Sequence, residues 1–204
     1  NEDWSASPPP QMVGGHVVRG NTFRYCGIEG VGGTGTPMGI WDVLVERNLF
    51  EWIGWQDAAP MSESAGMKLH NAKNLLFRNN VVRHIRFANG VWLDISNDNC
   101  RLTGNVFADI PGTVNPHAVH IEGSHVLNQV DNNIFYKLRG GILIRDTNNV
   151  IVAQNLFADC EDAGVTGTSG LGGPRPIGGH TNDGRGNKVH NNIFHAVGRA
   201  AIEF

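Results

Sequence analysis

The sequence predicts an all-β protein, a right-handed parallel β-helix of roughly seven coils, and three observations support this prediction. An Asn-x-Phe pattern, or a close variant of it, recurs seven times along the 204 residues. The 27 Gly and 22 Asn favour turns and left-handed backbone. Apolar residues also alternate with a period of two, which is typical of strands and not of helices. The chain is therefore expected to consist of short strands joined by bends.

The repeats lie 22 to 37 residues apart, with a mean spacing of 28.5 residues. A period in this range with several short strands per repeat fits one coil of a parallel β-helix, whereas a β-propeller blade is longer and the leucine-rich signature is missing. We expect each repeat asparagine to occupy a left-handed bend and to hydrogen-bond along the solenoid, and each following Phe to form an interior layer. The repeats start at Asn21, Asn48, Asn80, Asn105, Asn133, Asn155 and Asn192.

The organisation predicted along the chain is simple. Residues 1–15, with three consecutive prolines, are expected to form an extended lead-in, and residues 16–204 a single β-helix domain. Neither end resembles a cap, so we expect an excerpt of a longer chain, or an oligomer or partner that covers the solenoid ends. Residues 159–186 are rich in Gly and Pro and are expected to project as one long loop.

Charge and cysteine content exclude several classes of function. The formal net charge of −3 provides no basic surface for nucleic acid, and no apolar run is long enough to span a membrane. Cys26, Cys100 and Cys160 are far apart and odd in number, so we expect neither a disulfide framework nor a metal site formed by them. The function predicted below requires no cofactor. The composition fits a bacterial protein, either cytoplasmic or secreted.

The candidate chemistry lies on the second strand of the middle repeats. In four successive copies two positions are always apolar, as at Val91 and Leu93, and these side chains should face the interior. The position that follows them should then face outward on every coil. It is occupied in turn by His70, Asp94, Glu122 and Arg145. The outward position two residues earlier is occupied by Lys68, Trp92, His120 and Leu143.

Stacking in register would place Asp94 beside Glu122, because neighbouring strands lie about 4.7–4.9 Å apart. Two carboxylates separated by about 5–5.5 Å are typical of a retaining glycosidase, in which one attacks the anomeric carbon and the other protonates the leaving group. Trp92 would offer a flat face to a sugar ring, and Lys68, His70 and His120 would bind hydroxyl groups. The sequence thus predicts a carbohydrate substrate.

These strands carry a family resemblance. The segments Glu63-Ser-Ala-Gly-Met-Lys68-Leu-His70, Gly90-Val-Trp92-Leu-Asp94 and His120-Ile-Glu122-Gly-Ser-His resemble glycoside hydrolase family 120, which contains retaining β-xylosidases on a right-handed β-helix. The resemblance implies that Asp94 is the nucleophile and Glu122 the general acid/base. It also implies that Glu63, Lys68 and His70 bind substrate. The family's enzymes are longer and carry an additional β-sandwich part.

Arg145 leaves one question open, because its charge would lower the pKa of Glu122 while the Asp94 charge would raise it. The acid role requires Arg145, itself a candidate substrate-binding residue, to turn toward the loop near Asp146.

Two alternative functions share the predicted fold. One is a polysaccharide lyase or epimerase that uses Asp94, Asp98 and Glu122 with Arg145 or Lys68. The other is a non-catalytic β-helix that binds glycans or serves as a structural spike, and its function would survive the substitution Asp94→Asn.

Overall fold

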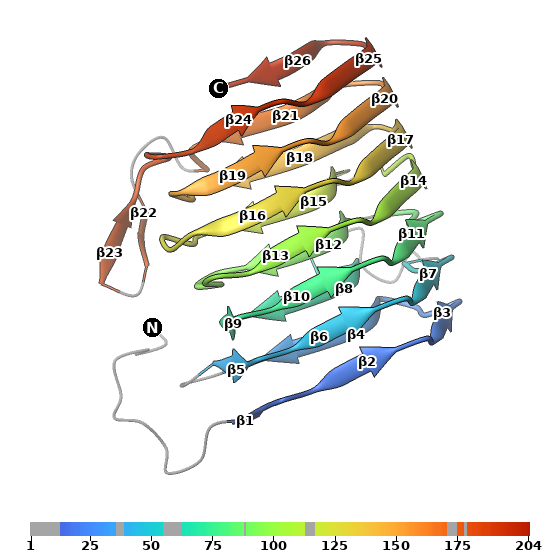
Figure 1. The fold of residues 1–204 in the computed structure, drawn as a ribbon, viewed down its shortest axis with the longest axis vertical. Coiled ribbons are helices and arrows are strands. Elements are labelled where there is room, and N and C mark those ends of the chain that lie inside the picture. The colour runs from blue at the N-terminus through green and yellow to red at the C-terminus, as the bar shows by residue number, and fades with distance from the viewer. Residues whose placement is uncertain are drawn as a thin grey trace.

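The computed structural model describes residues 13–35, 39–54, 63–87, 89–112, 117–170, 175–177 and 179–204. All regular elements in these ranges are β-strands, and no helix occurs among them. The strands wind into coils that stack in one column from β2 to β26 (Figure 1). The predicted right-handed parallel β-helix is therefore confirmed. None of the described segments is a helix long and apolar enough to cross a membrane.

Three parallel sheets of seven strands form the walls of the solenoid, which confirms the predicted number of coils. The first sheet contains β2 (Val17–Arg19), β6 (Leu44–Glu46), β10 (Leu76–Arg78), β13 (Arg101–Thr103), β16 (Asn128–Asp131), β19 (Val150–Ala153) and β24 (Lys188–His190). The second sheet contains β3 (Thr22–Arg24), β7 (Leu49–Glu51), β11 (Val81–Arg83), β14 (Val106–Ile110), β17 (Ile134–Leu138), β20 (Leu156–Cys160) and β25 (Ile193–Val197).

The third sheet carries the residues of the predicted site. Its strands are β4 (Glu29–Thr34), β8 (Ala65–His70), β12 (Asn89–Asp94), β15 (His117–Glu122), β18 (Gly140–Arg145), β21 (Ala163–Thr168) and β26 (Ala200–Glu203). A short additional sheet joins β1 (Val13–Gly14), β5 (Ile40–Trp41) and β9 (Ala72–Lys73). An antiparallel pair, β22 (Arg175–Ile177) and β23 (His180–Asn182), projects from the column (Figure 1).

The repeat asparagines form a continuous ladder at the corner between the first and second sheets. The backbone N–H of Asn105 donates to Oδ1 of Asn133 at 2.9 Å, and the N–H of Asn133 donates in the same way to Asn155. This confirms the predicted hydrogen bonding along the solenoid. The prediction that these asparagines are themselves left-handed is wrong, because the residue before each one has the positive φ. Those residues are Gly20, Arg47, Asn79, Gly104, Asn132, Gln154 and Asn191.

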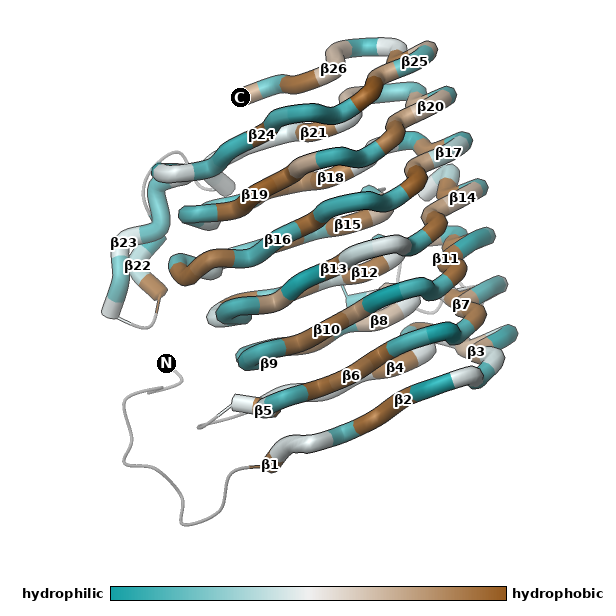
Figure 2. The backbone as a smooth tube through the Cα atoms, viewed as in Figure 1, coloured by the Kyte–Doolittle hydropathy of each residue, from teal (hydrophilic) through white to brown (hydrophobic). Residues whose placement is uncertain are grey.

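The interior contains the apolar residues that the alternation predicts. Hydrophobic segments recur along the strands from coil to coil (Figure 2). Phe107, Phe135 and Phe157 are fully buried and stack with ring centroids 5.0 and 4.6 Å apart. Val82 replaces Phe on the third coil, where the aromatic layer is interrupted. Cys100 and Cys160 are buried free thiols. Burial raises the pKa of Cys100 to about 12 and that of Cys160 to about 11.

Residues 159–186 do not form one loop. The segment first completes a coil with the end of β20 and with β21, and only then leaves the column as the β22–β23 hairpin. The prediction failed because the Gly- and Thr-rich strand β21 lacks the apolar alternation of its neighbours. The predicted lead-in is described only from Val13, which begins β1; residues 1–12 lie outside the described residues. At the column's ends, Val17 and Phe204 are exposed.

Candidate functional site

The four residues of the outward ladder are aligned across four neighbouring strands of the third sheet. Asp94 pairs in register with His70 on one side and with Glu122 on the other, and Glu122 pairs with Arg145. Val91 and Leu93 are completely buried in the core, as predicted. The strand alternation therefore directs Asp94 and Glu122 to the outer face of the sheet.

Asp94 is held by two basic side chains from the preceding coil. Oδ2 of Asp94 lies 3.0 Å from Nζ of Lys68 and 3.3 Å from Nε2 of His70. Only 7% of Asp94 is exposed, so these contacts are shielded from water. Lys68 also forms an ion pair with Glu63. Burial by itself would lower the pKa of Lys68, but the hydrogen bond with Glu63 and the charge of Asp94 outweigh it and raise that pKa.

The surroundings of Glu122 differ from those of Asp94. Burial, and secondarily the charge of Asp94, raise the pKa of Glu122 above its ordinary value, against the opposing influence of Arg175 and Arg145. Nη1 of Arg175 donates to Oε1 of Glu122 at 2.7 Å. Nε2 of His120 lies 3.6 Å from the other oxygen, Oε2. The two carboxyl groups of the pair thus have different surroundings, which is the usual basis for different roles.

Arg175 is a site residue that the sequence analysis missed. It begins strand β22 and contacts Glu122, which precedes it by 53 residues in the sequence. Nη1 of Arg175 also lies 3.8 Å from Oδ2 of Asp146. The hairpin is anchored by a His125–His180 ring stack at 3.6 Å and by a hydrogen bond from Asn148 to the carbonyl of Thr181. No local pattern around Arg175 could have indicated this contact, because the fold of the hairpin creates it.

Arg145 turns toward the segment after β21. Gly170 follows β21 and lies directly against the side chains of Arg145 and Asp146. A Cβ atom added at Gly170 would come within 2.6 Å of Nε of Arg145 and within 2.7 Å of Oδ2 of Asp146. The direct ion pair with Glu122 is made by Arg175 instead. Burial, and secondarily the charge of Asp94, leave the pKa of Glu122 raised, although the guanidinium groups of Arg175 and Arg145 both act to lower it. The acid role of Glu122 stays a prediction.

Trp92 does not form the open platform for a sugar ring that the sequence suggested. It is 4% exposed, and its ring lies between Nζ of Lys68, 3.8 Å from the centroid, and the ring of His120, 4.9 Å away. His120 is completely buried, which holds its pKa well below the ordinary value. The prediction failed because facing away from the core was equated with exposure to solvent. Trp92 instead packs between Lys68 and His120 beneath the covered face of the sheet.

Glu29 is a second residue that the sequence analysis missed. It lies on β4, and burial raises its pKa, while Lys68 lowers and Glu63 raises it. Among the predicted residues, Glu63 and His70 remain partly accessible, with side-chain exposures of 61% and 29%. The structure thus brings Glu63, Lys68 and His70 to the Asp94 side of the ladder.

This fold and the buried carboxylate pair define a parallel β-helix protein with one polar, enclosed strip on its third sheet. The family described as "Periplasmic copper-binding protein (NosD)" matches residues 40–202. The chain belongs to this family. Within the described residues, no group of three or more His, Cys, Asp or Glu side chains is arranged to hold a metal ion.

Two solved structures are similar to this chain in fold. The complex of XylC with xylose superimposes with a TM-score of 0.70 at 23% sequence identity, covering 89% of this chain and 28% of XylC. The periplasmic alginate epimerase AlgG gives a TM-score of 0.57 at 18% identity, covering 91% of this chain and 45% of the epimerase. The chain thus spans under a third of XylC and under half of AlgG. No curated protein matches the sequence.

Proposed function

We propose that this chain carries the catalytic pair of a retaining glycoside hydrolase of the family 120 type, acting on a β-xyloside or a related glycan. The observation that carries the proposal is the in-register pairing of Asp94 with Glu122 on adjacent coils, with both side chains almost completely buried. A strand spacing of about 4.7–4.9 Å is compatible with the short carboxyl separation of retaining enzymes. The wider gap of an inverting enzyme would require carboxyl groups on non-adjacent coils.

In the first step Asp94 attacks the anomeric carbon and forms a glycosyl ester. The glycosidic C–O bond breaks, and its electron pair stays on the leaving oxygen, which takes the proton from Glu122. Lys68 and His70 both contact Oδ2 of Asp94. Neither of them blocks Oδ1, which is therefore the oxygen that attacks. The two basic groups also fix the orientation of the carboxylate.

In the second step Glu122 acts as a base. Ester formation removes the charge of Asp94, which is one cause of the raised pKa of Glu122. The pKa of Glu122 must then fall, helped by the nearby Arg175. The carboxylate accepts a proton from water, the water oxygen attacks the anomeric carbon, and the bond to Asp94 breaks. Two inversions return the original configuration.

Substrate hydroxyl groups would be bound by the accessible polar residues around the pair. Glu63 and His70 lie on the Asp94 side, and Arg145 on the Glu122 side. The xylose bound in the XylC complex supports a sugar ligand for this fold, although this chain spans only 28% of that protein. The descriptions of the NosD family and of AlgG as periplasmic support an exported location. No step of this mechanism requires a metal or a cofactor.

The test is hydrolysis of a panel of aryl glycosides, starting with aryl β-xyloside. We expect activity in the wild type, its loss in Asp94→Asn, and its retention in Asp98→Asn, a matched control whose carboxylate pairs with Lys73 instead. Proton NMR of the first-formed anomer should show net retention. An inverted sugar would exclude the double displacement. In a parallel incubation with a polyuronate, epimerised or unsaturated uronates would indicate the lyase or epimerase chemistry instead.

Glu122 is tested separately by its leaving-group dependence. Glu122→Ala should slow poor leaving groups most, because an activated aryl group needs little protonation. Added azide should restore turnover by attacking the ester in the space left by the side chain. A Glu122→Ala variant that is equally slow for all leaving groups, with no azide rescue, would contradict the acid/base role.

A further inference from the structure

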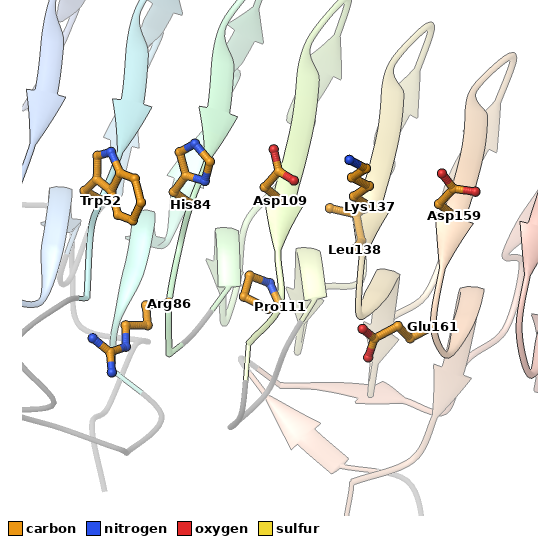
Figure 3. A pocket seen from close by; sticks show the side chains of 9 residues that line it. All are labelled: Trp52, His84, Arg86, Asp109, Pro111, Lys137, Leu138, Asp159 and Glu161. Atoms are coloured by element: carbon orange, nitrogen blue, oxygen red, sulfur yellow. The ribbon is translucent and has the colours of Figure 1, made fainter.

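A second polar surface lies at the corner between the second and third sheets. One residue on each coil of this corner has a left-handed backbone, with φ between 51° and 55° from the second to the sixth coil. The side chains of these residues all project outward in one line along the solenoid axis (Figure 3). This corner row consists of Trp52, His84, Asp109, Lys137 and Asp159. It is separate from the ladder that contains Asp94 and Glu122.

The corner row borders a cleft of about 420 Å³, a volume within the range of small-molecule sites. The cleft crosses the coils of β7, β11, β14, β17 and β20, so four strand spacings give it a length of about 19 Å. It is thus elongated along the solenoid axis. The remaining lining residues are Arg86, Pro111, Leu138 and Glu161.

The charged groups of the cleft differ from those on the neighbouring surface. On the outer face of the second sheet, Glu51 pairs with both Arg24 and Arg83. By contrast, within the described part of the chain, the carboxylates of the cleft and Lys137 form no ion pair, and Nζ of Lys137 lies 5.2 Å from the centroid of the Tyr136 ring. Carboxylates that have no cationic partner in the protein can accept hydrogen bonds from a ligand.

One end of the cleft is aromatic. The rings of Trp52 and His84 stack with centroids 4.4 Å apart, and 44% of Trp52 remains exposed. Pro111 adds further apolar surface, whereas Leu138, which also lines the cleft, is only 1% exposed. A sugar ring presents both an apolar C–H face and a rim of hydroxyl groups, so it matches a cleft that combines exposed aromatic carbon with charged donors and acceptors.

We propose that this corner cleft binds a neutral oligosaccharide, extended along the solenoid axis, at a site separate from the catalytic pair. The cleft's charges favour a neutral ligand. Its three carboxylates, on Asp109, Asp159 and Glu161, outnumber the two cations of Arg86 and Lys137, so a polyuronate would be repelled. The length of the cleft favours a chain of sugar units over a monosaccharide.

The proposal is tested by NMR titration of the full chain labelled at tryptophan indole nitrogen. The Asp94→Asn background prevents turnover, and Trp52→Phe assigns the Trp52 indole signal. Xylohexaose and cellohexaose are the neutral probes, and a mannuronate hexamer is the anionic probe. We expect the Trp52 signal to shift with a neutral probe only. Lys137→Ala should weaken the binding about tenfold, as for the loss of hydrogen bonds to a charged group.

Tyr25→Ala is the matched control, because Tyr25 occupies the same left-handed corner one coil earlier and does not line the cleft. It should leave the affinity unchanged. The proposal is overturned if neither neutral probe shifts Trp52, if the mannuronate hexamer binds equally well, or if Lys137→Ala has no more effect than Tyr25→Ala. Aryl glycoside hydrolysis is measured independently, so its failure would refute the catalytic proposal and leave this one standing.

Discussion

The asparagine ladder offers the most direct test of what holds the coils together, and Asn133→Ala is the perturbation of choice. Asn133 is 1% exposed and links two neighbouring coils. Its Oδ1 accepts a 2.9 Å hydrogen bond from the backbone N–H of Asn105, and its Nδ2 donates to the carbonyl of Leu102 at 3.0 Å. Alanine removes both the acceptor and the donor.

The magnitude follows from the groups left without partners. Residues Asn105 and Leu102 are buried, and an unsatisfied buried backbone group costs about 1–3 kcal/mol. Two such groups give about 2–6 kcal/mol. Two other side chains that contact Asn133 keep a hydrogen bond in the variant. Nδ2 of Asn105 still donates to the carbonyl of Phe77, and Oδ1 of Asn155 still accepts the backbone N–H of residue 133. The expected loss of unfolding free energy is therefore about 4 kcal/mol, well above a typical substitution.

The assay is urea unfolding followed by far-UV circular dichroism, with the m-value compared between variants because coils of a solenoid can unfold separately. Gln154→Gly is the matched control. Gln154 precedes the next asparagine of the ladder, is exposed and has a φ of 56°, which glycine adopts readily, so we expect a change of at most about 1 kcal/mol. A loss for Asn133→Ala no larger than that of the control, at an unchanged m-value, would refute the reasoning.

Three further predictions follow from burial and charge. Phe135→Ala should cost about 3–5 kcal/mol, and Trp92→Ala should cost a similar amount because that ring is also buried; urea unfolding measures both. Burial lowers the pKa of His117 to about 4, so folding stability should be complete above about pH 6.5 and fall by up to about 3 kcal/mol as the pH drops toward 4. His117→Gln should reduce this loss in thermal melts, and an unchanged acid sensitivity would contradict it. Arg175→Gln should raise the pKa of Glu122 and move the basic limb of the kcat/KM profile to higher pH; a shift to lower pH would count against the ion pair.

The catalytic candidates were accessible from the sequence because they belong to a repeated strand pattern. Once Val91 and Leu93 are assigned to the interior, the period of two places Asp94 on the outer face. Stacking of equivalent strands then places it next to Glu122, and the structure has this register. The burial of Asp94 and Trp92 could not be predicted from the sequence in the same way. The alternation states which face of the sheet a side chain occupies, but not what covers that face.

By itself the sequence determined the coil number, the asparagine ladder, the aromatic layer and the register of the third sheet. All of these depend on contacts between equivalent positions of adjacent coils, which the repeat spacing reveals. Only the tertiary structure decided that Arg175 binds Glu122, that Trp92 is enclosed, and that the corner row borders a cleft. The physical reason is that the periodicity relates equivalent positions of adjacent coils, whereas the burial of a side chain and its contacts with a distant segment depend on the path of the whole folded chain.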